Sequence, residues 1–357
     1  MNGTGRTSRN KKSKQQHTGG KLSKKQQAIL NAPVKLGDEV LVTIHGIGSS
    51  GEGVGRVDDF TVFVPFALPG ETVKVSINMV KKTYATGKLI DIVTPADNRI
   101  EPTCELYGVC GGCQLQHITY EGQLSLKTQK VKDVIERIGH QNPNLVKPAL
   151  GPKEPWAYRN KMQMPVGGTR GDIKMGFYAM GSHDIVQGTN CPIQDDGNNT
   201  IAQVCYDIAK ELDVEPYDEH TGKGVLRHVI GIEIVEPAII NARENARNNG
   251  YDNTEFIVAD AAVEMPKLYK AGVRPDVIVF DPIRAGCKEE VLTSAAGMEP
   301  KRIVYVSCNP ATMARDIEIL THYGYELQEV QPVDMFPMTA HVEAVALLTR
   351  SEAVSNY

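Results

Sequence analysis

The feature that most constrains the fold is an alternation of apolar strand-like runs and helix-like runs between residues 231 and 350. The strand-like runs are rich in Val and Ile, and helical patterns follow them. Such near-continuous apolar strands are typical of a parallel sheet covered on both faces. The pattern therefore predicts an α/β domain of the Rossmann-like kind. The strand-like runs are GIEIV, FIVA, VIVF, IVYVS and a segment near 326–333, and EAVALLTR ends the pattern.

The preceding part of the chain has a different character. Residues 34–94 contain short β-rich runs separated by Gly, Pro and charged turns, which predicts an all-β, OB-like barrel. Barrels of this kind commonly bind single-stranded nucleic acid, although some are only structural modules. Residues 100–228 are mixed and irregular, with a helical stretch at 120–138 and strand-like pieces at 159–166 and 173–178.

The charge distribution is uneven along the chain. Residues 1–30 contain eight Lys or Arg and no Asp or Glu, which indicates a basic disordered tail that serves solubility or attracts phosphate. No apolar run in the 357 residues approaches the ~18 that a membrane span needs, and no apolar stretch follows the basic start. We expect a soluble cytoplasmic protein that does not interact with a membrane.

Four of the seven cysteines suggest a metal site. Cys104-x5-Cys110-Gly-Gly-Cys113 places three thiols close together, and the glycines allow a tight turn. Cys191 lies in the same irregular region and is the candidate fourth ligand. From spacing alone an iron–sulfur cluster, a zinc ion and no metal all remain open. Cys205 and Cys287 are interpreted as packed apolar residues.

Polar residues stand where the C-terminal strands end, and ligands of open α/β sheets bind at that edge. Glu233 ends the first strand and is a candidate for the ribose of a nucleoside cofactor. Asp260 and Asp281 follow the next two strands, and Asp260 is a candidate for adenine contact. Cys308 follows IVYVS and is a candidate nucleophile, although core packing is the alternative. Glu343 is a candidate base.

Together these residues resemble a known family. The cysteine pattern, TNCPIQ around Cys191, DPIRAGC (281–287), YVSCNPATMARD (305–316) and DMFPMTAHVE (334–343) are similar to the RNA uracil-C5 methyltransferases. The bacterial enzymes that act on 23S ribosomal RNA are the most similar group, and their N-terminal TRAM domain resembles residues 34–94. The resemblance extends from about residue 34 to 350 and is carried mainly by the SCNP and HVE motifs with the four cysteines.

The resemblance implies a role for each matching residue. Cys308 would add to C6 of the target uracil, S-adenosylmethionine would supply a methyl group to C5, and Glu343 would remove the C5 proton. Glu233 would hold the cofactor ribose, and Asp281 would lie in the cofactor and base pocket. Arg159 and Lys161 would lie near RNA. The cysteines Cys104, Cys110, Cys113 and Cys191 would hold a 4Fe–4S cluster.

The chain departs from the family between residues 230 and 231. The family has there the rest of its central domain and the first strand, Gly-rich loop and helix of the methyltransferase fold, whereas VLRHVI (225–230) is followed directly by GIEIV (231–235). We therefore expect a truncated central domain (100–228), a partial methyltransferase domain (231–350) and weak or absent binding of S-adenosylmethionine. The alternative to an active enzyme is a catalytically inactive RNA-binding remnant.

Overall fold

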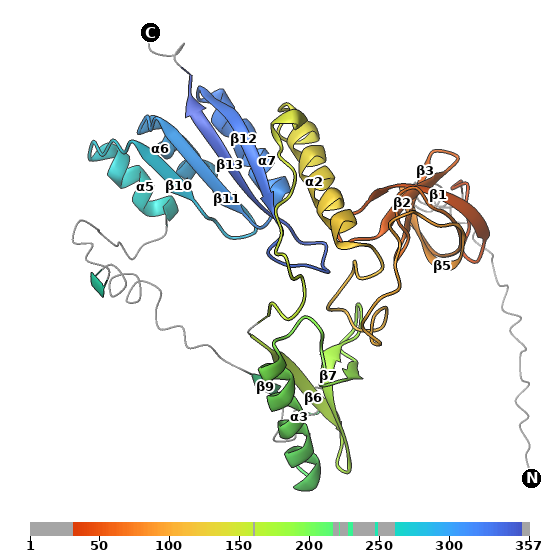
Figure 1. The fold of residues 1–357 in the computed structure, drawn as a ribbon. Helices are drawn as coiled ribbons and strands as arrows, with labels where there is room; N and C mark the ends of the chain where they lie inside the picture. The colour runs from red at the N-terminus through yellow and green to blue at the C-terminus, as the bar shows by residue number, and fades with distance from the viewer. Residues whose placement is uncertain are drawn as a thin grey trace, which may run out of the picture.

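The computed structural model describes residues 31–159, 161–216, 221, 228–230, 247–248 and 261–351 (Figure 1). The first unit is a closed five-stranded barrel in which the strands follow the order β1-β2-β3-β5-β4. The predicted all-β barrel is thus confirmed. Its strands are β1 (Glu39–Ile47), β2 (Gly53–Val57), β3 (Phe60–Val64), β4 (Thr72–Val80) and β5 (Tyr84–Thr94).

The barrel closes because alternate residues of its strands point inward and are apolar. Val42, Ile44, Val73 and Val75 are each 0 or 1% exposed and belong to one core. Glycine is required where strands approach closely: a Cβ on Gly55 would lie 2.2 Å from Val42 Cγ1. These features make the barrel an independent packing unit beside the rest of the chain.

The long helix α2 (Tyr120–Arg137) lies between the barrel and the C-terminal sheet (Figure 1). Its N-cap is Thr119, whose hydroxyl accepts a hydrogen bond from the Gly122 amide at 3.2 Å. Val131 and Ile135 belong to the core of the C-terminal sheet, whereas Leu126 packs against Leu115 and Ile118 of the segment before the helix. The short 3-10 helix η1 (Pro143–Leu145) follows it.

A second, smaller sheet follows α2 in the chain. Its strands are antiparallel in the order β8-β7-β6-β9, and helix α3 (Asp196–Glu211) packs on it. Cys205 lies on α3 and is partly buried against this core. The strands are β6 (Gln163–Thr169), β7 (Asp172–Tyr178), β8 (Ile185–Gln187) and β9 (His228–Ile230).

The C-terminal sheet has the strand order β10-β11-β13-β12. The elements between α5 (Ala261–Lys270) and its long final pair are β10 (Val277–Phe280), α6 (Glu289–Gly297), β11 (Arg302–Ser307) and α7 (Pro310–His322). That pair is β12 (Tyr325–Val333) and β13 (Glu343–Arg350). The predicted Rossmann-like alternation of strands and helices is present here.

The prediction that this sheet is parallel was wrong for part of the described residues. Only β10 and β11 run parallel, whereas β13 pairs antiparallel with both β11 and β12. Burial alternates along β11 and β13: Ile303 and Tyr305 are buried, whereas Val304 between them is half-buried. One face of the sheet therefore packs under α2, α6 and α7, and the other is less covered.

No helix within the described residues is long and apolar enough to cross a membrane.

Candidate active site

Three of the predicted site residues meet at one edge of the C-terminal sheet. Asp281 directly follows β10 and Cys308 directly follows β11, and these two strands are parallel, so both residues leave the sheet at the same edge. Glu343 is the first residue of the antiparallel strand β13. Ser307 and Ala344 are the last pair of the β11–β13 ladder, and Cys308 and Glu343 are the next residues along the two strands, so both lie at this end of the ladder.

The turn after β11 is fixed by hydrogen bonds of its own residues. Asn309 caps α7, its side chain accepting from the Ala311 amide at 3.3 Å, and Pro310 occupies the first helical turn. The Ser307 hydroxyl donates to the Asn309 carbonyl at 3.1 Å and accepts from the Asn309 amide at 3.0 Å. Cys308 is half-buried in the middle of this turn.

Helix α7 also holds the loop 281–288, which carries Arg284. The Arg284 carbonyl accepts hydrogen bonds from Asn309 Nδ2 at 3.0 Å and from the Thr312 hydroxyl at 3.2 Å. Asp316 is fully buried and accepts from the Cys287 amide at 2.8 Å and from the Tyr305 hydroxyl. The guanidinium of Arg315 donates to Asp316 and to the Ala285 carbonyl.

The charges around Glu343 favour its use as a base. Burial raises the pKa of the Glu343 carboxyl, the neighbouring Asp281 raises it further, and Arg284 opposes both effects. Arg284 Nη2 lies 3.2 Å from His341 Nδ1. Burial and the nearby Arg284, Lys130 and Lys127 cations lower the pKa of His341, which keeps this ring neutral as an acceptor.

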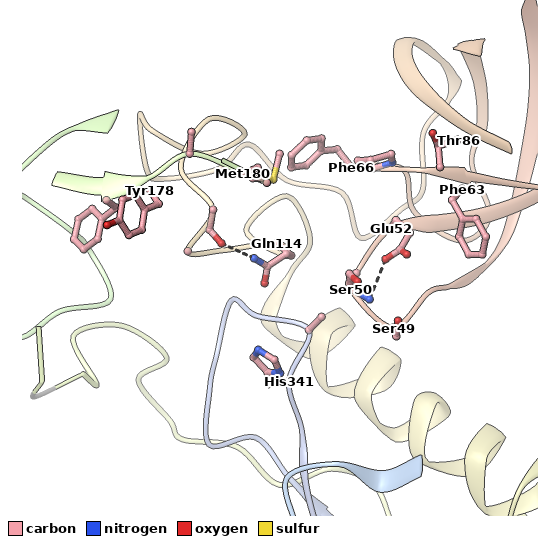
Figure 2. A pocket seen from close by; sticks show the side chains of 18 of the residues that line it. Ser49, Ser50, Glu52, Phe63, Phe66, Thr86, Gln114, Tyr178, Met180 and His341 are labelled. Carbon is pink, nitrogen blue, oxygen red and sulfur yellow. Dashed lines mark hydrogen bonds between the residues drawn. The ribbon is translucent and has the colours of Figure 1, made fainter. Parts of the chain in front are cut away.

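A cleft of about 1410 Å³ lies between the barrel and the small antiparallel sheet, and Ala340 and His341 of the C-terminal domain also line it. Figure 2 shows Phe63 and Thr86 on the barrel side, Tyr178 on the side of β7 and His341 from the C-terminal domain. No Lys or Arg stands among the described residues that line it, so aromatic and apolar groups dominate its wall. The aromatic lining residues are Phe63, Phe66, Tyr84, Phe177 and Tyr178.

The four predicted metal ligands line a second, small cavity. Cys104, Cys110, Cys113 and Cys191 surround about 50 Å³, which is room for more than one water-sized group. Burial, and the other thiols nearby, raise the pKa of Cys113 to about 11. No three His, Cys, Asp or Glu side chains in the described ranges are arranged to hold a single metal ion.

Two buried glutamines contribute to this cavity. Gln116 accepts a hydrogen bond from the Cys104 amide at 3.1 Å and bonds to the Cys113 thiol. Gln194 is 3% exposed, and its Oε1 has no partner. An unpaired buried amide oxygen is costly, so this cavity is shaped for a further polar group.

The other predicted residues are distributed as follows. Arg159 is exposed and lines the mouth of the cysteine cavity, and Lys161 is exposed just before β6. Glu233 and Asp260 lie outside the described residues. Cys287 is partly buried against the core of the C-terminal sheet, and its Sγ lies 3.7 Å from the hydroxyl oxygen of Tyr305.

Comparison with known proteins gives this geometry a context. Residues 33–90 match the TRAM domain, and residues 223–351 match the family described as tRNA (Uracil-5-)-methyltransferase. An uncharacterized RNA methyltransferase of Clostridium acetobutylicum is 34% identical over 89% of this chain and 98% of its own. The chain belongs to the RNA uracil-C5 methyltransferase family.

Other members and neighbours agree with that assignment. An uncharacterized RNA methyltransferase of Halalkalibacterium halodurans is also 34% identical and covers 89% of this chain and 98% of its own. The fold is similar to that of the Pyrococcus abyssi tRNA (uracil-54, C5)-methyltransferase, solved in complex with S-adenosyl-L-homocysteine. That similarity has a TM-score of 0.65 at 20% identity and covers 87% of this chain and 99% of the other.

The relatives are longer inside the matched region. The alignment with the Clostridium acetobutylicum methyltransferase spans 452 positions, whereas this chain has 357 residues in all, so at least 95 positions hold no residue of this chain. In the described part of the C-terminal sheet, β10 is an edge strand, hydrogen-bonded to β11 alone. Both observations concern the segment that the sequence predicts to be missing between residues 230 and 231.

Sequence reasoning did not find two groups of residues that the structure brings to the site. The aromatic wall of the cleft comes from strands of two different sheets, and single aromatic residues in strands carry no functional signal. Lys127 lies on α2 and reaches the loop before Glu343, which is more than 200 residues away in the chain. The polar residues Gln123, Lys127 and Lys130 on one helix face are the only hint in the sequence.

Proposed function

We propose that this chain acts on C5 of a uridine in RNA, with Cys308 as nucleophile and Glu343 as base. The observation that supports the proposal is that the β11–β13 ladder ends at the pair Ser307–Ala344, so the next residues, Cys308 and Glu343, lie at the same sheet edge, where ligands of such sheets bind. Membership of the uracil-C5 methyltransferase family supports the same assignment.

The chemistry requires both residues. C5 of uracil is a weak nucleophile until the Cys308 thiolate forms a bond to C6 and shifts the electron pair of the C5=C6 bond to C5 and O4. S-adenosylmethionine, when bound, supplies an electrophilic methyl group for that carbon. Glu343 then takes the C5 proton, the C5=C6 bond forms again, and the electron pair of the S–C6 bond returns to Cys308. The raised pKa of Glu343 makes it a stronger base for this step.

The same two residues support a partial reaction that needs no methyl donor. When Cys308 adds to C6 and C5 takes a proton from water, Glu343 can remove the original C5 proton before the thiolate leaves. Each cycle exchanges the hydrogen on C5 with solvent and leaves the uracil unchanged. This exchange isolates the nucleophile and the base from the cofactor site.

For the substrate, the aromatic cleft supports a single-stranded segment of RNA. Bases stack on aromatic side chains in sequence-tolerant binding, and the target base must leave its own stack to reach the sheet edge. His341, which lies two residues before Glu343 in the chain, is one of the residues that line the cleft. We propose 23S ribosomal RNA as the substrate on the sequence resemblance alone; the fold neighbour is named for tRNA, so both RNAs belong in the test.

The methyl donor is the point where the chain departs from its relatives. Asp281 is the described residue that fits a cofactor pocket at this edge, because it follows β10 beside Cys308. We infer that the positions missing from this chain include the first strand and Gly-rich loop, because at least 95 aligned positions hold no residue of this chain and VLRHVI (225–230) is followed directly by GIEIV (231–235). This inference favours weak binding of S-adenosylmethionine and keeps the RNA-binding remnant as the second candidate function.

For the cysteine cavity we propose a 4Fe–4S cluster rather than zinc. In a four-iron cluster each thiolate binds a different iron, so the ligands stand further apart than around one zinc ion. The observation that supports the proposal is that all four cysteines line one cavity. Such a cluster would hold together segments that are distant in the chain.

The test combines two assays on the full chain. Labelled S-adenosylmethionine is supplied with unmodified 23S RNA and with tRNA, and label at C5 of uracil is measured for the wild type and Cys308→Ala. RNA binding is measured in parallel. Label that Cys308→Ala abolishes supports the methyltransferase. Binding without label supports the inference that a segment is missing, provided that labelling appears when the corresponding segment of the Clostridium acetobutylicum relative is inserted between residues 230 and 231. Absence of both binding and label contradicts the proposal.

A further inference from the structure

Helix α2 presents three buried or half-buried polar residues on one face. Gln123, Lys127 and Lys130 are spaced by four and three residues, so they lie along one side of the helix. All three contact residues 334–342, the loop that joins β12 to β13 and ends at Glu343. We call residues 334–342 the Glu343 loop.

Lys127 makes the central contact. Its ammonium lies 2.6 Å from Asp334 Oδ1 and donates to the Phe336 carbonyl at 3.1 Å, and both charged residues are 2% exposed. Asp334 also accepts from the Phe336 amide at 3.1 Å and from the Tyr120 hydroxyl at 3.2 Å. The ion pair therefore fixes the start of the loop from the helix.

The other two residues hold the rest of the loop. Gln123 accepts from the Met338 amide at 2.8 Å and donates to the Met338 sulfur at 3.1 Å. Lys130 donates to the Ala340 carbonyl at 2.8 Å and to the Ser49 carbonyl of the barrel at 3.2 Å. The face of α2 thus binds the loop at every second residue from 334 to 340.

The loop is also held from its other side. The carbonyl of Met338 accepts from the amides of Gln114 and Leu115, both at 3.0 Å. Met338 has a φ of 67°, a left-handed conformation that a side chain of this size adopts only when its surroundings impose it. The loop is therefore forced into one shape between the helix and the segment that follows Cys113.

A buried ion pair gives little stability compared with apolar packing of the same volume. The directional contacts of the Lys127–Asp334 pair do, however, specify a single position of the Glu343 loop. The Lys127 ammonium fixes two points of this loop. Near the end of the loop His341 contacts Arg284, and Glu343 follows as the first residue of β13.

We propose that Lys127 is a positioning residue for Glu343: by holding Asp334 and Phe336 it sets the Glu343 loop, and with it the place of the carboxylate at the sheet edge where Cys308 lies. The inference rests on the proposed function in that Glu343 is taken as the base. The role of Lys127 is separate from RNA binding, because its ammonium is buried between α2 and the loop.

The test uses Lys127→Met, which keeps the length of the side chain, and the double variant Lys127→Met/Asp334→Asn, which leaves no buried carboxylate without a cation. Three quantities are measured: the rate of C5 hydrogen exchange in RNA, the RNA dissociation constant, and hydrogen–deuterium exchange of peptides from 334–343. Lys301→Met is the matched control, because Lys301 makes an ion pair with Asp276 at 2.8 Å on the surface of the same domain.

A positioning role predicts a kcat for C5 exchange about 100-fold lower in Lys127→Met, the loss expected from a displaced catalytic group, with RNA affinity unchanged. The double variant regains thermal stability but neither the exchange rate nor the protection of 334–343. Recovery of both in the double variant, or wild-type protection of the loop in Lys127→Met, overturns the proposal. If the wild type shows no C5 exchange on any RNA, the proposed function fails, and deuterium exchange of the loop still decides whether Lys127 holds it.

Discussion

The buried carboxylate of Asp316 allows a prediction with a magnitude. Asp316→Ala removes the acceptor of the Tyr305 hydroxyl and of the Cys287 amide, whereas Arg315 can turn to solvent because its side chain is 45% exposed. Only the Cys287 sulfur, a weak acceptor 3.7 Å away, then remains for the Tyr305 hydroxyl. A donor that loses its acceptor in this way costs about 1–3 kcal/mol, so the two together cost about 2–6 kcal/mol of the free energy of opening of this sheet.

The assay is native-state hydrogen exchange of peptides from β11 and α7, because it reports the opening of this sheet separately from the barrel. We expect the free energy of opening to fall by the amount above in Asp316→Ala, while peptides of β1 to β5 keep their protection. The loop 281–288 should lose protection as well, because Asp316 and Arg315 hold its backbone.

A second variant tests the reasoning itself. Adding Tyr305→Phe to Asp316→Ala removes one of the two unpaired donors. The free energy of opening of the double variant should therefore be about 1–3 kcal/mol higher than that of Asp316→Ala, although Tyr305→Phe alone destabilises the wild type. A loss below about 1 kcal/mol in Asp316→Ala, or no recovery in the double variant, would refute the account of this cluster.

Three further predictions concern the site, the barrel and the cleft. The rate of C5 exchange should rise with pH, and the midpoint of the rise should lie above the ordinary pKa of a Glu carboxyl. Arg284→Gln should move this midpoint higher, because Arg284 lowers the pKa of Glu343. A pH–rate profile of both proteins measures the two midpoints. Burial raises the pKa of Glu71, but hydrogen bonds from Arg99 and backbone amides lower it to a net value below the ordinary one. The barrel should therefore lose this stability as pH falls through the folded pKa, and less in Arg99→Gln, as acid unfolding followed by circular dichroism would show. Phe63→Ala should weaken RNA binding by about 1–3 kcal/mol with an unchanged salt dependence, measured by titration at two salt concentrations.

Local patterns were sufficient for much of the fold. The alternation in EAVALLTR gave β13 with its observed bounds, and the apolar runs near 277–280 and 302–307 are strands. The helical stretch predicted at 120–138 is α2, which ends at Arg137. These elements were predictable because period and turn residues are encoded within a few neighbouring positions.

Strand direction and long-range pairing were not predictable in the same way. An apolar run has the same appearance in a parallel and an antiparallel strand, so the sequence did not show that β13 runs against β11. The burial of Lys127 against Asp334 depends on how α2 packs on a sheet formed much later in the chain. The strand-end residues Asp281 and Cys308 were found because topology places such residues at one edge, and the role of Glu343 came from resemblance.

The measurement that tests the central claim most directly is C5 hydrogen exchange in uridine of full-length RNA, without S-adenosylmethionine. RNA labelled with tritium at C5 of uracil is incubated with the wild type, Cys308→Ala, Glu343→Gln and the control Cys205→Ala, and tritium released to water is counted. The account predicts release by the wild type and Cys205→Ala, and none by the other two variants. Release that persists in Cys308→Ala, or a wild type that binds RNA and releases no tritium, would contradict it.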